Sequence, residues 1–252
     1  MFTLSVLFDL DGVVSDTASV HAKAWKVVFD RFLEGRGEAG RPFQVESDYL
    51  LHLDGKMRTA GIESFIQSRG LAMPPSGPAD DNGLETINGI GNIKNRIFRE
   101  LISDGGVTIF GDATRLMGRL MDAGCPLGLA SSSKNAAFIL DKAGLTPLFE
   151  AVLDGNIAEE RQVASKPHPD FYRYVAALLG RPPGECAVIE DAISGIISAR
   201  RAGIGLVVGI SRHGDSRALW DSGADMVVET LDDVPTEKFI GFHEVPHARL
   251  YR

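Results

Sequence analysis

The sequence of 252 residues has no apolar stretch that approaches the roughly 20 residues needed to span a bilayer. The first residues also lack a basic segment, and their apolar run leads directly into Asp9 and Asp11. We therefore expect neither a membrane anchor nor a signal peptide. Cysteine is nearly absent, since Cys125 and Cys186 are the only two, each beside or within an apolar run. Free thiols in a reducing cytoplasm are the expected state, and a disulfide is the alternative.

Basic residues are too few for a generic nucleic-acid binder. The chain has 26 Lys and Arg against 34 Asp and Glu, which gives a net charge of −8 at pH 7. This balance argues against binding to nucleic acid or to an anionic membrane, although a local basic pocket is compatible with it. With 44% hydrophobic and 24% charged residues, the composition is that of a globular protein. The length suits one large domain or two small ones.

Two carboxylates follow an apolar run close to the start of the chain. The run Val6-Leu7-Phe8 ends in Asp9-Leu10-Asp11-Gly12. Because the run is apolar on both faces, it predicts a fully buried strand. Two buried carboxylates are costly unless a cation or a reaction compensates, and open α/β sheets bind ligands at the carboxyl ends of their strands. The pair therefore indicates a metal and a reaction; the alternative is an Asp-Gly turn in which Asp11 only forms the turn.

Residues from about 16 to 104 have an almost entirely helical pattern, without a convincing strand. Ser15-Asp16-Thr17 begins the first helical pattern, and a loop with three prolines and two glycines lies at 73–83. Further helices are expected at about 49–53, 57–68 and 92–103.

From Val107 onward, short apolar runs alternate with helical patterns. Together with a first strand at residues 4–8, strands are expected at 126–130, 151–153, 187–189, 205–210 and 226–228. This alternation predicts an α/β fold with a doubly wound parallel sheet and right-handed crossovers. Because the helical block separates the first strand from the others, we expect an α/β core domain (1–15 and 105–235) with an inserted α-helical domain (16–104). Residues 236–252 form a C-terminal tail with no clear pattern.

Polar residues also follow the later strands. The hydroxyls, amides and ammonium of Ser131-Ser132-Ser133-Lys134-Asn135 suit a phosphate, although helix capping alone accounts for such a turn equally well. Prolines on either side of His168 stiffen the loop that carries Lys166, a residue that would otherwise be a surface charge. Glu190-Asp191 is a second acidic pair at a strand end. Two acidic pairs and a lysine predict a hard-cation site facing a phosphate, and Mg²⁺ suits such a donor set.

These residues resemble a known family. In their order along the chain, Asp9-Leu10-Asp11-Gly12-Val13, Ser131, Lys166 and Glu190-Asp191 are similar to the four motifs of the haloacid dehalogenase superfamily. The helical insertion corresponds to that superfamily's α-helical cap on a Rossmann-like core. Within the superfamily the chain most resembles the β-phosphoglucomutase family. The cap positions that carry this likeness are His21, Trp25, the loop Leu53-Asp54-Gly55-Lys56-Met57-Arg58, and Lys94-Asn95.

Three features depart from the family pattern. They are the 73–83 insertion, Phe110-Gly111-Asp112 in place of a Pro-Gly, and a longer C-terminus. We expect all three to lie away from the chemistry. The insertion falls in the cap, which selects the substrate, so the identity of the substrate stays open.

The resemblance implies a role for each motif residue. Asp9 would be the nucleophile that forms an aspartyl-phosphate, and Asp11 the general acid and base. Mg²⁺ would be held by Asp9, the backbone carbonyl of Asp11, and Asp191, with Glu190 acting directly or through water. Lys166 and Ser131 would neutralise and orient the phosphoryl group. The residues expected to bind substrate are His21, Trp25, Gly55, Arg58, Lys94, Ser132, Ser133, Lys134 and Asn135.

The implied activity is that of a β-phosphoglucomutase, which interconverts β-glucose 1-phosphate and glucose 6-phosphate through glucose 1,6-bisphosphate. The alternative is a sugar-phosphate phosphatase with the same core, in which water ends the reaction. We expect a cytoplasmic monomer whose partner is a small sugar phosphate, with no nucleic acid or membrane bound.

Other functions fit the sequence less well. Gly89-Ile90-Gly91-Asn92-Ile93-Lys94 superficially resembles a phosphate-binding loop, but it lacks a third glycine in register and a preceding strand. No Gly-x-Ser-x-Gly occurs, which disfavours an α/β-hydrolase. Dehalogenation needs no second aspartate, so Asp11 favours phosphoryl transfer. A non-catalytic binding protein on this scaffold would have lost motif residues, and none is lost.

Overall fold

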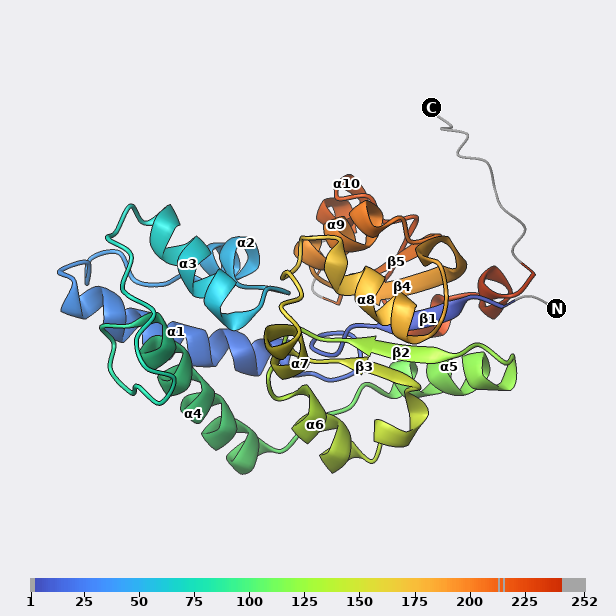
Figure 1. Ribbon diagram of the computed structural model, residues 1–252, viewed down its shortest axis with the longest axis horizontal. Helices are drawn as coiled ribbons and strands as arrows, with labels where there is room; N and C mark the ends of the chain where they lie inside the picture. The colour runs from blue at the N-terminus through green and yellow to red at the C-terminus, as the bar shows by residue number, and fades with distance from the viewer. Residues whose placement is uncertain (1–2, 213, 215, 242–252) are drawn as a thin grey trace.

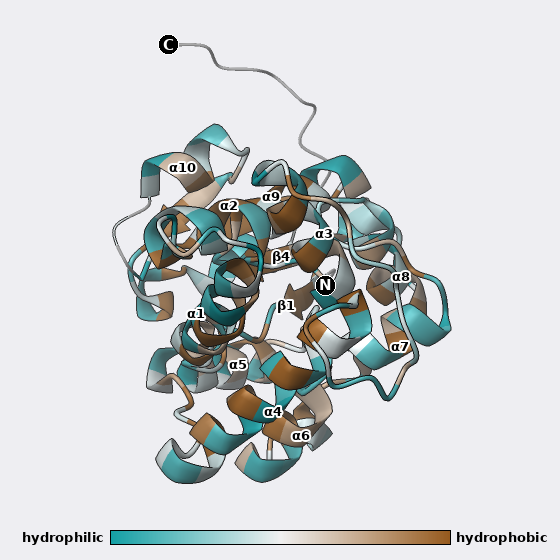
Figure 2. Ribbon diagram, turned by 90° about the vertical axis from the view of Figure 1, so that its left-hand side faces the viewer, coloured by the Kyte–Doolittle hydropathy of each residue, from teal (hydrophilic) through white to brown (hydrophobic). Residues whose placement is uncertain are grey.

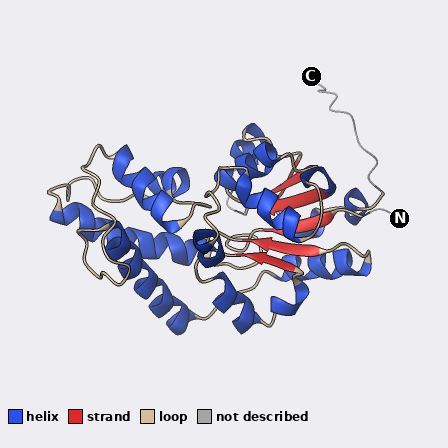
Figure 3. Ribbon diagram, viewed as in Figure 1, coloured by secondary structure: helices blue, strands red, loops and turns tan. Residues whose placement is uncertain are grey.

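The computed structural model of the chain describes residues 3–212, 214 and 216–241. The elements separate into two regions, which the colours of Figure 3 distinguish. One region consists of helices alone, and in the other region helices flank a single sheet. Figure 1 shows that the two regions lie side by side along the longest axis of the molecule.

The sheet consists of parallel strands in the order β3-β2-β1-β4-β5-β6. This confirms the predicted α/β fold with a doubly wound parallel sheet. The order runs outward from β1 in both directions, and the edge of the sheet beside such a reversal is where ligands bind. The strands are β1 (Ser5–Phe8), β2 (Leu127–Ala130), β3 (Ala151–Leu153), β4 (Cys186–Glu190), β5 (Leu206–Ile210) and β6 (Met226–Val228).

The side chains of β1 alternate between two hydrophobic cores. Val6 and Phe8 pack against α5 and α6, while Leu7 packs against α8 and α9. All three are fully buried, because helices cover both faces of the sheet. The helices of this region are α5 (Gly111–Asp122), α6 (Ala136–Ala143), α7 (Gly155–Glu160), α8 (Asp170–Leu178), α9 (Ile193–Ala202) and α10 (Ser216–Asp221).

The other region, which we call the helical segment, has an aromatic core of its own. The Phe29 ring packs against the rings of Trp25, Phe43 and Phe65. Brown and teal alternate along α1 and α4 in Figure 2, as expected for helices with one apolar face. The elements are α1 (Ala18–Gly35), a π-helical turn (Val45–Tyr49) that continues into α2 (Leu50–His52), α3 (Arg58–Ser68) and α4 (Ile87–Gly105).

Helix α4 begins at Ile87, earlier than the expected start near Asn92. The hydroxyl of Thr86 caps it by accepting a hydrogen bond from the Gly89 amide at 3.0 Å. The loop at 73–83 packs on the first two turns, where the side chains of Asn88 and Asn92 donate to its carbonyls. The added turn therefore depends on contacts with a loop, which helical periodicity does not reveal.

Two further features differ from the sequence pattern. The pattern does not predict α7, which is short and begins because the Asp154 carboxylate accepts from the amides of Asn156 and Ile157. The first part of the expected tail is ordered against the core. The Leu4 amide donates to the carbonyl of Phe239, whose side chain is fully buried. The rest of the expected tail, 242–252, lies outside the described residues.

The expectations about membrane helices and thiols can be compared with the structure. Among the helices of the described ranges, none is both long enough and apolar enough to cross a bilayer. Cys125 and Cys186 are buried and free, which agrees with the expectation of thiols. Burial raises the pKa of the Cys186 thiol to about 12, so this group stays protonated at neutral pH.

The packing of the 73–83 loop on α4 can be tested at Gly89. A Cβ atom at Gly89 would lie 2.0 Å from the carbonyl oxygen of Gly83. We expect Gly89→Ala to lower the free energy of unfolding by about 1–3 kcal/mol, because the loop must move away. Gly118→Ala in α5 is the matched control, since a Cβ there meets no atom within 4 Å. This control should gain about 0.5–1 kcal/mol from helix propensity. Urea unfolding curves measure both, and equal stability of the two variants would contradict the packing.

Candidate active site

Lys166 lies at the centre of the motif residues. Its ammonium donates to Asp9 Oδ1 at 2.6 Å, to Glu190 Oε1 at 2.6 Å and to the carbonyl of Ala130 at 3.0 Å. These acceptors stand at the ends of β1, β4 and β2 respectively. Burial opposes the charge of Lys166, but the Asp9 and Glu190 carboxylates outweigh it and raise the pKa of Lys166 above its ordinary value. The lysine is therefore a buried cation that joins three strand ends.

Glu190 is held by protein donors on both carboxylate oxygens. Its Oε1 also accepts from the Tyr172 hydroxyl at 2.8 Å, and its Oε2 accepts from the Ala192 amide at 3.0 Å. The side chain is fully buried. Tyr172 reaches Glu190 from α8, and no motif around Tyr172 in the sequence identifies it as a site residue.

Asp9, Glu190 and Asp191 form an acidic cluster. One carboxylate oxygen from each lies within 4.8 Å of the others. Burial raises the pKa of Asp9 and of Asp191 well above the ordinary value; Glu190 adds to the effect at Asp9, and Asp54 does so at Asp191. The site is tight, because a Cβ at Gly12 would lie 1.8 Å from Asp191 Oδ2. Three closely spaced carboxylates, of which those of Asp9 and Glu190 are buried and that of Asp191 is partly buried, are a fitting donor set for a divalent cation.

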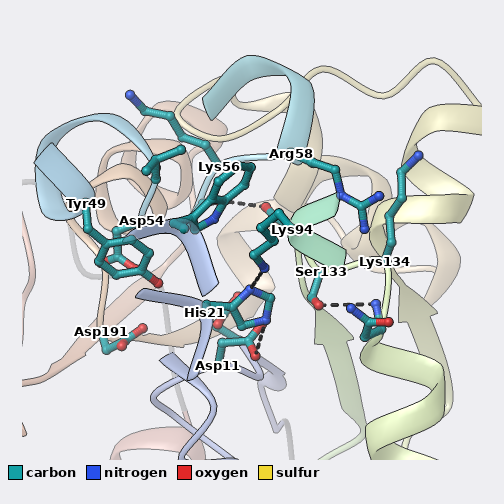
Figure 4. Close-up of a pocket in the computed structure, with 16 residues that line it drawn as sticks. Asp11, His21, Tyr49, Asp54, Lys56, Arg58, Lys94, Ser133, Lys134 and Asp191 are labelled. Carbon is teal, nitrogen blue, oxygen red and sulfur yellow. Dashed lines mark hydrogen bonds and ion pairs between the residues drawn. The ribbon is translucent and has the colours of Figure 1, made fainter. Parts of the chain in front are cut away.

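The Asp11 side chain does not join the acidic cluster. Its Oδ1 accepts a short hydrogen bond from the Thr17 hydroxyl and lies 3.3 Å from His21 Nε2, and its Oδ2 accepts from Ser131 at 3.4 Å. Figure 4 shows His21 directly above Asp11. Burial opposes ionisation of Asp11, but His21 and Thr17 outweigh it and lower the pKa of this carboxyl. Asp9 and Asp11 thus have opposite pKa shifts, although they are two residues apart.

A buried lysine lies on the other side of His21. Lys94 Nζ is 2.5 Å from His21 Nδ1, and it also lies over the rings of Phe98 and Trp25. Burial lowers the pKa of Lys94 well below its ordinary value, and the nearby Arg58 guanidinium adds to the effect. Burial and Lys94 together lower the pKa of His21. A polar chain therefore connects Asp11 to Lys94 through His21.

Arg58, at the start of α3, lies at the far end of the pocket. Its Nη2 donates to Asn95 Oδ1 at 3.0 Å, and the same oxygen accepts from Asn135 Nδ2 at 2.8 Å. Burial lowers the pKa of Arg58 to about 10, so the guanidinium still carries its charge at neutral pH. Lys134 lies on the same side of the pocket as Arg58 (Figure 4). Its ammonium pairs with Glu159 at 2.5 Å.

One pocket brings most of the expected site residues together. Between the helical segment and the carboxyl ends of the strands, it contains about 580 Å³ of atom-free space, part of it open to solvent. Ser131, Lys166 and Glu190 do not line it and lie buried beneath it. The expected residues that line it are Asp9, Asp11, His21, Trp25, Gly55, Arg58, Lys94, Ser132, Ser133, Lys134, Asn135 and Asp191.

Several lining residues had no assigned role in the sequence analysis. Tyr49, Leu53, Asp54 and Lys56 line the pocket from the helical segment. Leu53, Asp54 and Lys56 flank Gly55 in the loop that resembles the β-phosphoglucomutase family. Their position beside Gly55 could therefore have identified them as site residues from the sequence. Tyr49 hydrogen-bonds to Asp54, and only the three-dimensional structure reveals this pair.

One departure from the family pattern lies closer to the chemistry than expected. Asp112 forms a two-point ion pair with Arg212, whose guanidinium lies 3.6 Å from the centre of the Phe110 ring. Arg212 also donates to the carbonyls of Gly12 and Val13, directly after Asp11. The expectation that Phe110-Gly111-Asp112 lies away from the chemistry is therefore wrong, because this segment holds the backbone behind Asp11 through Arg212.

Comparisons with known proteins agree with this geometry. A family described as haloacid dehalogenase-like hydrolase matches residues 5–203. The chain is 40% identical over 235 residues to a beta-phosphoglucomutase of Mycobacterium tuberculosis (strain CDC 1551 / Oshkosh), covering 90% of each chain. It is 28% identical to hexitol phosphatase A of Escherichia coli (strain K12), over 92% of this chain and 93% of that one. A crystal structure of a beta-phosphoglucomutase from Clostridium difficile matches with a TM-score of 0.72 at 23% identity, over 94% and 95% of the chains.

The acidic cluster predicts a stability response to Mg²⁺. A carboxyl whose pKa is raised in the folded state loses stability as the pH rises from its unfolded pKa to its folded pKa. Ionising the cluster therefore lowers the stability of the fold, and a bound cation offsets this cost. We expect Mg²⁺ to raise the melting temperature of the wild-type protein.

Asp191→Asn should abolish this gain. It should also stabilise the ion-free protein by about 1 kcal/mol, because it removes a partly buried charge that two other carboxylates repel. Asp221→Asn is the matched control, since its side chain is 72% exposed and it should keep the wild-type response. Thermal unfolding with and without Mg²⁺ measures all three proteins. An Asp191→Asn variant that still responds to Mg²⁺ like the wild type would rule out the cluster as the cation site.

Proposed function

The chain belongs to the haloacid dehalogenase-like hydrolase family and is a phosphotransferase or phosphatase, and from this premise we propose that it is a β-phosphoglucomutase. The proposed reaction interconverts β-glucose 1-phosphate and glucose 6-phosphate through glucose 1,6-bisphosphate. One observation carries the proposal: a single pocket has the proposed nucleophile Asp9 at one end and the partly buried, charged guanidinium of Arg58 at the other. A substrate that carries a phosphate at each end in turn needs such a pocket.

The two regions of the structure suit a division into core and cap. We assign residues 1–15 and 105–235 to the core domain and residues 16–104 to the cap domain. The sheet supplies the reacting groups, and the helical segment supplies His21, Arg58 and Lys94. A site between two such parts can exclude water when the parts close on each other.

The acidic cluster is the proposed Mg²⁺ site. Asp9, Asp191 and the backbone carbonyl of Asp11 would hold the ion. Both oxygens of Glu190 already accept hydrogen bonds from the protein, so this residue fits best behind the site, acting through water or through Lys166. When bound, the ion would screen the repulsion between the carboxylate nucleophile and the phosphoryl oxygens.

Asp9 is the proposed nucleophile, and Asp11 the proposed acid and base. The Asp9 carboxylate attacks phosphorus, the bond from phosphorus to the sugar oxygen breaks, and Asp11 protonates that oxygen. In the second half, Asp11 takes the proton from the attacking sugar hydroxyl, and the phosphoryl group leaves Asp9. The hydrogen bonds from Thr17 and Ser131 orient Asp11 for both halves. The Lys166 ammonium neutralises charge beside Asp9.

The far end of the pocket is suited to the phosphate that does not react. The planar guanidinium of Arg58 can bind two phosphate oxygens at once. Ser133, Lys134 and Asn135 supply a hydroxyl, an ammonium and an amide to the same end. Lys134 is paired with Glu159 and would exchange this partner for the phosphate.

The second candidate is a sugar-phosphate phosphatase. The observation that favours it is the 28% identity to hexitol phosphatase A over nearly the whole chain. The two reactions share the first half and differ in the acceptor, which is a sugar hydroxyl in a mutase and water in a phosphatase. A product assay therefore separates them.

We expect the purified protein with Mg²⁺ and a trace of glucose 1,6-bisphosphate to convert β-glucose 1-phosphate to glucose 6-phosphate. Coupled detection of glucose 6-phosphate and a colorimetric phosphate assay should be run on the same sample. Release of inorganic phosphate in step with substrate loss would overturn the mutase and support the phosphatase. Asp9→Asn is the control, because it should abolish acid-stable phosphoenzyme in either case.

The proposed role of Arg58 gives a second test at Gly91. A Cβ at this position of α4 would lie 2.6 Å from Arg58 Cδ, so Gly91→Ala must displace the guanidinium. We expect the KM for the sugar phosphate to rise about tenfold, which corresponds to the loss of one good charge-assisted contact. Phosphoenzyme formation from acetyl phosphate, which has no distal group, should stay within about twofold of wild type. Gly118→Ala is again the control, and an unchanged KM in Gly91→Ala would exclude Arg58 from substrate binding.

A further inference from the structure

Three serines of the sheet region hold one loop of the helical segment by its backbone. This docking loop, residues 54–57, connects α2 to α3. Ser132 Oγ donates to the carbonyl of Gly55 at 2.7 Å, and Ser194 Oγ donates to the carbonyl of Asp54 at 2.8 Å. Ser165 Oγ accepts from the amide of Met57 at 2.8 Å. We call Ser132, Ser165 and Ser194 the serine latch.

Each latch serine lies within three residues of a motif residue. Ser132 directly follows Ser131, and Ser165 directly precedes Lys166. Ser194 is in the first turn of α9, on the segment that follows Asp191. The three serines thus come from the three segments that follow or precede the phosphoryl-binding and acidic groups. The docking loop can make all three hydrogen bonds only when these loops are placed correctly relative to each other.

The fit between the loop and the latch is close. Gly55 has a φ of +68°, and a Cβ there would lie 2.3 Å from Ser194 Oγ. The hydroxyl of Ser165 also donates to the carbonyl of Lys166 at 3.2 Å, which leaves its lone pairs for the Met57 amide. The latch binds backbone groups, so its hydrogen bonds do not use the side chains of the docking loop.

We propose that the serine latch positions the helical segment over the loaded nucleophile and thereby decides which acceptor receives the phosphoryl group. This inference rests on the proposed function. Arg58 directly follows the docking loop, so the latch also fixes the distance between the nucleophile and the distal phosphate site. The latch serines are positioning residues, since they act through the loop and through Arg58.

The transfer from Asp9 has two possible outcomes, and they differ in one reactant. The bond from phosphorus to the Asp9 oxygen breaks, and a bond from phosphorus to the acceptor oxygen forms. Asp11 takes the acceptor's proton, and the Asp9 carboxylate is regenerated. With the helical segment docked, the bound sugar hydroxyl is the acceptor; when the docking loop is released, water enters and inorganic phosphate leaves.

The test measures partition between these outcomes. Ser132→Ala, Ser165→Ala and Ser194→Ala are assayed for inorganic phosphate released per glucose 6-phosphate formed. Loss of one hydrogen bond shifts a closing equilibrium by about three- to tenfold. We expect each variant to raise the phosphate-to-product ratio by about this factor. In Ser165→Ala and Ser194→Ala, whose serines do not line the pocket, phosphoenzyme formation from acetyl phosphate should change by less than about twofold.

Ser198→Ala is the matched control for Ser194→Ala. Both serines lie on α9, but Ser198 donates to the carbonyl of His168 within the sheet region and does not contact the docking loop. It should keep the wild-type ratio. Unchanged ratios in all three latch variants, or an equal rise in the Ser198→Ala variant, would overturn the latch.

A second measurement keeps the latch testable if the proposed function fails. The chain has two tryptophans, and Trp25 lines the pocket at 5% exposure, whereas Trp220 is 50% exposed. In a Trp220→Phe background, acrylamide quenching reports the opening of the pocket around Trp25. We expect the quenching constant to rise at least twofold in the latch variants and to stay unchanged in the Ser198→Ala variant.

The two measurements separate the two proposals. If the wild-type protein releases only inorganic phosphate, the mutase is excluded, and the Trp25 quenching alone decides on the latch. If the wild-type protein is a mutase and quenching does not change in any latch variant, the latch is excluded and the mutase stands.

Discussion

A single buried ammonium makes the rest of the site possible. Lys166 bonds to Asp9 and Glu190 and to the end of β2, so one side chain links three parallel strands at their carboxyl ends. Without this cation, the carboxylates after β1 and β4 would stand close together in a dry interior, and their mutual repulsion would add to the cost of desolvation. The Tyr172 hydroxyl donates a further hydrogen bond to the Glu190 carboxylate. The Lys166 ammonium compensates negative charge of the acidic cluster from the side of the sheet. The side of the cluster that faces the pocket is therefore left for a ligand.

The charges above this floor are arranged in order along the pocket. Asp9 and Asp191 lie beside the sheet, Asp11 comes next with its lowered pKa, and the buried Lys94 and the partly buried Arg58 lie above it in the helical segment. Carboxylates at one end and the charged Arg58 guanidinium at the other make a pocket whose two ends differ in sign. A metal-bound phosphoryl group suits the first end, and a free phosphate suits the second.

The sequence predicts the strands and the motif residues well, because both depend on local patterns. Six short apolar runs form six strands, and polar residues directly after parallel strands must meet at one edge of the sheet. Contacts between distant segments leave no such pattern. Arg212 bonds to the carbonyl of Gly12, 200 residues away in the chain, and Tyr172 reaches Glu190 from a helix whose pattern shows only an apolar face. Helix α4 similarly gains its first turn from a loop that packs on it, whereas helical periodicity reports only the residues of the helix itself.

The division of labour between the two regions follows from their stiffness. Asp9, Lys166 and Glu190 are held at the ends of a parallel sheet that is buried on both faces, so the positions of these three side chains do not depend on the helical segment. The helical segment meets this edge through a few hydrogen bonds between side chains and backbone, and each of these contributes modestly to the closed state. On the proposed function, small changes in these contacts would alter the acceptor while leaving the nucleophile intact. One set of core residues can then serve both a mutase and a phosphatase, in keeping with the similarity of this chain to relatives named for each activity.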